Sequence, residues 1–143
     1  MAKGTDTTRD CDAATRAGRL TKAHQFMDAA NTIETLADDA ADIADAYVTM
    51  CVHAGIAAAD VICCARLGKH SRGEDHGSAI ELLDQAGPDE AKHLRALLGM
   101  KTKAGYTSVP VSGSEHKRAG RAAKALLEAA ERVRPRCQHQ RSG

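Results

Sequence analysis

The segment over residues 40–67 constrains the fold most strongly, because it is apolar around nearly its whole circumference when read as a helix. A helix of that kind has to be covered by other elements on most sides. Aromatic residues make up only 2% of the chain, so the core must be built from alanine, leucine, isoleucine and valine. Small residues with high helix propensity favour closely packed helices over a sheet. The sequence therefore predicts a helical core around this segment.

Apolar residues at three-four spacing predict four further helices around the central one. Capping signals set their limits: Asp38 and Asp39 before the central helix, Gly68 after it, Pro88 at a restart and Ser112 opening a capping box. The four helices are expected over residues 13–37, 74–85, 88–105 and 113–134.

We therefore predict one all-α domain, an antiparallel bundle of about five helices over residues 13–134. A disordered lead over 1–12 and a disordered tail over 135–143 are expected to flank it. Neither a membrane span nor a signal peptide is expected, and we predict a cytoplasmic protein. The apolar surface of the central helix exceeds what four short neighbours are expected to cover, so a homodimer is also predicted.

Charge is distributed unevenly along the chain. Residues 1–60 carry 5 Lys and Arg against 10 Asp and Glu, whereas residues 61–143 carry 15 against 9, a balance of −5 followed by +6. The basic half could meet an anionic partner or the acidic half of a second copy, and solvated helix faces of mixed sign would give the same counts.

The five cysteines show no spacing typical of a metal site. Cys51, Cys63 and Cys64 fall in the central helix, and we interpret them as small buried hydrophobic residues in a reducing compartment. A zinc site using Cys137 and His139 is the weaker alternative. We expect no metal and no cofactor.

Polar residues of the central helix fall on one stripe. Asp45, Thr49, His53 and Asp60 follow at intervals of four, four and seven, which keeps them on one side of a helix. Buried polar groups need partners. The stripe therefore either lines a groove or forms the solvent-facing edge of the helix.

The segment LLGMKTKAGY over residues 97–106 is the densest polar cluster outside that stripe. Here an apolar helix ends in Lys101, Lys103 and Tyr106. The sequence lacks a phosphate-binding glycine loop, an HExxH pair and a nucleophile elbow. We expect the polar stripe and this charged helix end to lie side by side and to share a pocket.

The order of these features, with GEDH at 73–76 and RAAKALLEAAERVR at 121–134, resembles the HEPN superfamily of small helical-bundle proteins over roughly residues 15–134. The resemblance implies a homodimer. For many members it also implies a metal-independent RNase of toxin–antitoxin or defence systems. A subset pairs with a nucleotidyltransferase that modifies a tyrosine near the catalytic motif, for which Tyr106 would be the candidate.

Active members of that superfamily carry an arginine, four to six residues and then a histidine. Lys101 and Tyr106 stand at these positions here, and a phenol, which titrates near pH 10, is a poor proton carrier at neutral pH. The motif is therefore degenerate, and Lys101, Tyr106 and His53 are weak catalytic candidates. Binding of nucleic acid depends less on the missing histidine than cleavage does. The residues expected to bind nucleic acid are Arg95, Lys101, Lys103, Lys117, Arg121 and Lys124.

The sequence thus leaves three functions open. The first is a HEPN-like RNA-binding dimer that has lost its catalytic motif, with Asp45, Thr49, His53 and Asp60 facing the cleft. The second is a helical dimer that serves as a scaffold for another protein, and the third is a residual metal-independent RNase.

Overall fold

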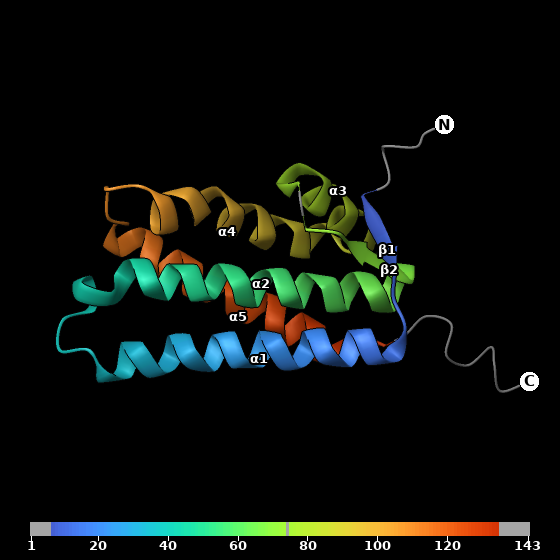
Figure 1. Cartoon of the computed structure of the whole chain (residues 1–143), viewed down its shortest axis with the longest axis horizontal. Coiled ribbons are helices and arrows are strands. Elements are labelled where there is room, and N and C mark those ends of the chain that lie inside the picture. Colours follow the sequence, from blue (N-terminus) through green and yellow to red (C-terminus); the bar gives the residue numbers. More distant parts are fainter. Residues whose placement is uncertain (1–6, 74, 135–143) are drawn as a thin grey trace, which may run out of the picture.

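The computed structural model describes residues 7–73 and 75–134 and shows an all-α bundle with one small two-stranded sheet (Figure 1). The predicted antiparallel bundle of about five helices is confirmed. Its elements are β1 (Thr8–Asp10), α1 (Ala13–Leu36), the short 3₁₀ turn η2 (Ala40–Ile43), α2 (Ala44–Leu67), β2 (Lys69–Ser71), α3 (His76–Ala86), α4 (Pro88–Tyr106) and α5 (Gly113–Arg132).

Helices begin and end at the capping residues predicted from the sequence. Asp39 accepts a hydrogen bond from the Ala41 amide over 3.0 Å, and Gly68 ends α2 in the left-handed conformation with φ 75°. Ser112 and Glu115 form the predicted capping box at the start of α5. Local sequence therefore decides where each helix begins and ends.

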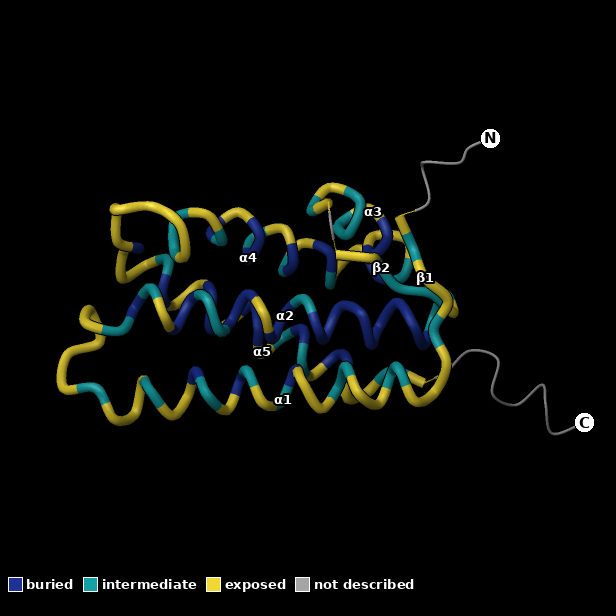
Figure 2. The backbone as a smooth tube through the Cα atoms, viewed as in Figure 1, coloured by how far each residue is buried: buried dark blue, intermediate teal, exposed yellow. Residues whose placement is uncertain are grey.

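The central element of the bundle is α2, with α1, α4 and α5 packed around it and α3 above α4 (Figure 1). Figure 2 shows α2 as the most continuously buried stretch of the chain. At Gly55 a Cβ atom would collide with the side chain of Leu97 on α4 and would lie unusually close to the side chain of Leu126 on α5. The missing side chain lets three helices meet at one point.

Neighbours from the same chain cover the apolar surface of α2. Most of its residues are buried against α1, α3, α4, α5 and β2. The sequence argument that four neighbours leave a large part of this helix uncovered is therefore wrong. A homodimer stays a prediction that now lacks this support.

The N-terminal segment forms part of the fold. Thr8–Asp10 pairs antiparallel with Lys69–Ser71 at the end of α2, with Arg9 opposite His70. The prediction of a disordered lead over 1–12 is wrong for the strand, because β2 offers it backbone partners. Residues 1–6 lie outside the described residues, as does the predicted tail over 135–143.

A disulfide bond joins Cys11, just after β1, to Cys64 near the end of α2. The interpretation of Cys64 as a free buried thiol is therefore wrong. Cys51 and Cys63 are free and buried, as predicted. The bond and the strand pairing together fasten residues 8–11 to the C-terminal end of the central helix.

A polar contact among three helices lies at the opposite end of α2 from the disulfide bond. His116 Nε2 lies 2.7 Å from Glu34 Oε2, and the His116 ring stacks on Tyr47 with 4.3 Å between centroids. The Tyr47 hydroxyl lies against Gly120, where a side chain would displace it. The contact ties α1, α2 and α5 together.

By length and composition, Ala40–Leu67 is the one segment of the described chain that could span a membrane. In the bundle, 72% of its most apolar stretch is buried. The central helix of a water-soluble bundle has the same properties, so this feature is weak evidence for a membrane span.

Candidate functional site between α2 and α4

Two pockets lie along the seam between α2 and α4, and we call them together the α2–α4 cleft. The larger holds about 190 Å³ and reaches α3, and the smaller holds about 140 Å³ and reaches Tyr106. His53 of α2 and Lys101 of α4 line both of them. The end of α4 and the polar side of α2 therefore meet at one site.

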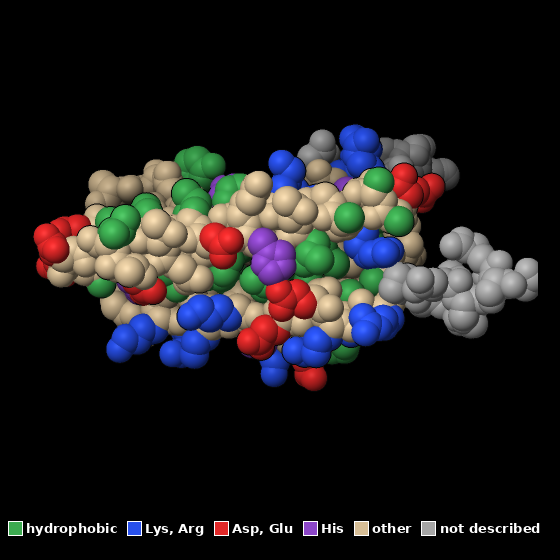
Figure 3. All heavy atoms as spheres, turned by 90° about the horizontal axis from the view of Figure 1, so that it is seen from below, with side chains coloured by type: hydrophobic (Ala, Val, Ile, Leu, Met, Phe, Trp, Pro, Cys, Tyr) green, Lys and Arg blue, Asp and Glu red, His purple; other side chains and the backbone are tan. Residues whose placement is uncertain are grey.

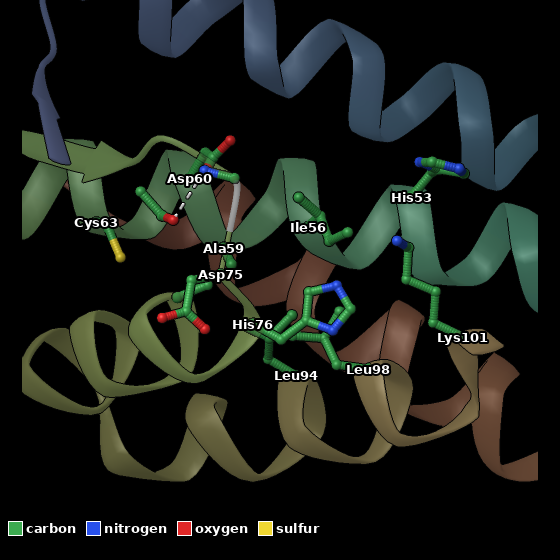
Figure 4. Close-up of a pocket in the computed structure, with 13 residues that line it drawn as sticks. His53, Ile56, Ala59, Asp60, Cys63, Asp75, His76, Leu94, Leu98 and Lys101 are labelled. Carbon is green, nitrogen blue, oxygen red and sulfur yellow. Dashed lines mark hydrogen bonds between the residues drawn. The ribbon is translucent and has the colours of Figure 1, made fainter. Parts of the chain in front are cut away.

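The larger pocket has apolar walls and polar ends. Its walls come from Ile56 and Ala59 of α2, Ala79 of α3, and Leu94 and Leu98 of α4. In Figure 4 the His76 imidazole lies between these walls, His53 and Lys101 lie together at one end, and Asp60, Cys63 and Asp75 lie toward the other. A mostly apolar pocket with a few converging polar groups is typical of a ligand site.

His53 lies at the junction of the two pockets, with part of its side chain exposed and part covered. Its ring stacks on Phe26 of α1, with 5.1 Å between centroids. Partial burial lowers the pKa of His53, and the positive charges of Lys101 and Arg19 lower it further. The imidazole is therefore neutral near pH 7, and it can both donate and accept a hydrogen bond.

Lys101 supplies a positive charge to the cleft. Its ammonium lies 5.6 Å from the centre of the Tyr106 ring, close enough for a cation–π contact. Within residues 7–73 and 75–134, no carboxylate forms an ion pair with Lys101. The charge is therefore available to an anionic ligand. Thr49 of α2 adds a hydroxyl to the smaller pocket.

Asp60 is buried and already engaged. Its Oδ2 accepts a hydrogen bond from Arg19 Nε over 2.9 Å, and its Oδ1 lies 3.9 Å from His70 Nδ1. Burial raises the pKa of the Asp60 carboxyl, and the Arg19 guanidinium opposes that rise. In Figure 4 the carboxylate points toward α1. Its main role is to join α1, α2 and β2.

The fourth residue of the polar stripe, Asp45, lies outside the cleft. Its Oδ1 accepts a hydrogen bond from the Val111 amide over 3.0 Å and so anchors the segment before α5. Of the four residues expected to face a cleft, the structure brings Thr49, His53 and Asp60 to it.

The six basic residues expected to bind nucleic acid do not form one surface. Lys103 forms an ion pair with Glu115 over 2.9 Å. Arg95 is exposed on α4 and lines neither pocket of the cleft. The other three cations are exposed on α5: Lys117, Arg121 and Lys124.

No α5 residue lines either pocket of the cleft, and in Figure 4 the helix passes behind α2. Figure 3 shows lysine and arginine side chains mixed with acidic ones on the face seen there. The basic side of α5 is therefore separate from the cleft. Lys101 alone of the six residues lines it.

Sequence reasoning missed several residues of the larger pocket. His76 and Asp75 entered the sequence analysis only as part of the GEDH run over residues 73–76, and neither was named as a site residue. Both reach the pocket because the segment after β2 folds back over α2. The run from Asp75 to Ser78 could have revealed this, because an aspartate before a helical segment is a typical N-cap. In the structure Asp75 Oδ1 caps α3 by accepting a hydrogen bond from the Gly77 amide over 3.0 Å.

Cys63 lines the same pocket without being reactive. Burial raises the pKa of its thiol to about 12, so it stays protonated at neutral pH. In the described part of the chain no group of three or more His, Cys, Asp or Glu is placed to hold a metal ion. The alternative zinc site at Cys137 and His139 lies outside the described residues.

The cleft can therefore hold a small, partly apolar ligand with an anionic group beside Lys101. Comparisons of the chain with protein-family models, with curated proteins and with solved structures gave no match.

Proposed function

We propose that this protein is a HEPN-like, RNA-binding helical bundle that holds single-stranded RNA in the α2–α4 cleft. The observation that carries the proposal is that His53 and Lys101 line both pockets of the cleft. Three groups here suit phosphate oxygens: a lysine that forms no ion pair within the described part of the chain, a neutral imidazole and the Thr49 hydroxyl. The resemblance to the HEPN superfamily supports RNA as the anion.

Single-stranded RNA suits the cleft better than duplex. Its bases are free to enter small pockets and to stack on aromatic side chains. Tyr106 is 75% exposed beside Lys101, so a base can reach its ring. The separate basic side of α5 would contribute long-range attraction rather than contacts within the cleft.

The proposal is for binding rather than cleavage. Tyr106 stands in place of the histidine of active family members. Cleavage would need another proton carrier, and His53 is the cleft histidine that was named from the sequence as a catalytic candidate. Cleavage of a defined RNA that His53→Ala abolishes would restore the RNase alternative.

The test is binding of an unstructured RNA of about ten nucleotides, followed by fluorescence anisotropy between about 50 and 200 mM salt. Lys101→Glu should weaken RNA binding at least about tenfold. Lys101→Met should reduce the slope of the logarithm of the binding constant against the logarithm of the salt concentration by about one. The matched control is Lys92→Glu, a charge reversal at an exposed site of α4 that lines neither pocket.

If Lys101→Glu and Lys92→Glu reduced RNA affinity equally, RNA would be attracted only by the net charge of the protein. The assignment of the binding site to the cleft would then be wrong. No binding at low salt, together with co-purification of one specific protein, would favour the scaffold alternative. Light scattering at micromolar concentration tests the predicted homodimer separately.

A further inference from the structure

We propose that the larger pocket of the α2–α4 cleft takes one nucleotide, whose base carries an exocyclic amino group. The inference rests on the proposed function and specifies which part of an RNA strand the cleft reads. The size of the pocket, its apolar walls and the opposite character of its two ends support this assignment.

The size of the pocket limits the ligand to a small group. A volume of about 190 Å³ lies below the range of about 300–1,000 Å³ that is usual for sites of drug-sized molecules. A dinucleotide cofactor is too large for it. One ring system with a sugar at the pocket mouth is of suitable size.

The walls suit a flat ring. In Figure 4, Leu94 and Leu98 of α4 lie opposite Ile56 of α2, and Ala79 of α3 also lines the pocket. Figure 4 shows the His76 imidazole between these walls, where it offers an aromatic face. Unstacked bases in RNA–protein complexes bind between apolar and aromatic side chains in this way.

The two ends of the pocket differ in charge. Lys101 and His53 lie at one end, where a phosphate would bind. Asp75 lies toward the other end, and its carboxylate accepts hydrogen bonds from the Gly77 amide over 3.0 Å and the Ser78 hydroxyl over 2.8 Å.

These bonds lower the pKa of Asp75, which keeps its carboxylate charged. Each carboxylate oxygen can accept a further hydrogen bond. An amino group at the far edge of the base is the natural donor. Cytosine, adenine and guanine carry one, whereas uracil does not.

The direct test compares cytidine 5′-monophosphate with uridine 5′-monophosphate by calorimetry and by NMR titration of the methyl groups of Ala79, Leu94 and Leu98. The cytidine nucleotide should bind roughly tenfold more tightly, because its exocyclic amino group can donate to the Asp75 carboxylate, whereas uracil carries a carbonyl oxygen at the same ring position. Cytidine without phosphate and ribose 5-phosphate without a base should each bind more weakly than the complete nucleotide. Equal affinity for the two nucleotides would overturn the assignment of the base.

Variants test the position of the site. Ala79→Leu fills the pocket without changing charge and should reduce affinity for the cytidine nucleotide at least about tenfold. Ala96→Leu makes the same change on α4 outside both pockets and should leave affinity unchanged. Asp75→Asn preserves a good N-cap, so α3 should remain folded while the preference for cytidine over uridine is lost. Circular dichroism checks that each variant is folded.

The two proposals fail in different ways. RNA binding that depends on Lys101 but is unaffected by Ala79→Leu would overturn the nucleotide pocket and support the cleft as an RNA surface. Binding of the cytidine nucleotide without any binding of RNA would overturn the proposed function and support the pocket. Binding of neither ligand would overturn both.

Discussion

Arg19 Nε donates a hydrogen bond to Asp60 Oδ2 over 2.9 Å, and this contact links the outer helix α1 to the buried end of α2. Arg19→Met should lower the free energy of unfolding by about 1–3 kcal/mol, because it leaves a buried carboxylate without its charged partner. Lys22→Met removes an exposed cation from the same helix and should change stability by less than about 0.5 kcal/mol. Urea unfolding measures both.

The same pair predicts a dependence on pH. Without Arg19, only burial and the weaker influence of His70 act on Asp60, so its folded-state pKa rises further above the ordinary 3.8. A carboxyl with a raised folded-state pKa binds its proton more tightly in the folded state, so lowering the pH toward 3.8 stabilises the fold. Arg19→Met should therefore recover part of its loss at low pH relative to Lys22→Met. Parallel pH profiles for the two variants would contradict this account of Asp60.

Gly55 should not tolerate a side chain. Gly55→Ala would force a Cβ atom into Leu97 and close against Leu126, and should lower stability by about 1–3 kcal/mol despite the better helix propensity of alanine. At Gly18 of α1 no described atom, apart from the neighbouring backbone of the same helix, lies within 4 Å of such a Cβ atom, and Gly18→Ala should gain up to about 1 kcal/mol. Thermal or chemical unfolding of the two variants gives the comparison, and equal shifts would refute the close contact.

His53 should titrate below the ordinary value of 6.5, since burial and nearby cations disfavour its charged form. NMR titration of the imidazole signals tests this, with His53→Gln identifying the resonance. Lys101→Met should raise the pKa of His53, and Lys92→Met should leave it unchanged. No change with Lys101→Met would mean that the two side chains are not neighbours in solution.

The titration of His53 also affects stability. An imidazole with a lowered folded-state pKa binds fewer protons when folded, so its contribution is present above 6.5 and is lost as the pH falls through the lowered value. The wild-type protein should therefore lose more stability than His53→Gln between about pH 7 and 5.

Cys11→Ser should cost about 2–5 kcal/mol of stability, because it opens a covalent loop spanning 53 residues. Thiol titration of the denatured protein checks the bond itself, since reduction should expose two more thiols than the unreduced protein shows. An equal count before and after reduction would refute the disulfide. Because such bonds are rare in the cytosol, the same count on protein taken directly from cells tests the predicted cytoplasmic location.

Much of the bundle was predictable because its signals are local. Asp39, Gly68, Pro88 and Ser112 each act on the backbone within a few residues, and all four mark helix ends in the structure. The buried central helix followed from its continuous apolar surface. Predicting these features does not require knowing which helices pack against each other.

Features that depend on distant parts of the chain were missed. Strand pairing between β1 and β2 and the Cys11–Cys64 bond join residues more than fifty positions apart, and no periodicity marks such partners. The cations of α5 were grouped with Lys101 because both segments are basic. Only the packing order reveals that α5 lies behind α2, away from the cleft.

The disulfide between Cys11 and Cys64 encloses α1 and almost all of α2 within one covalent ring. The helices α3, α4 and α5 lie outside that ring and are held by noncovalent packing alone. Thermal fluctuations should therefore detach the second half of the chain before they separate the first two helices. The most slowly exchanging backbone amides of the protein should then belong to the α1–α2 hairpin.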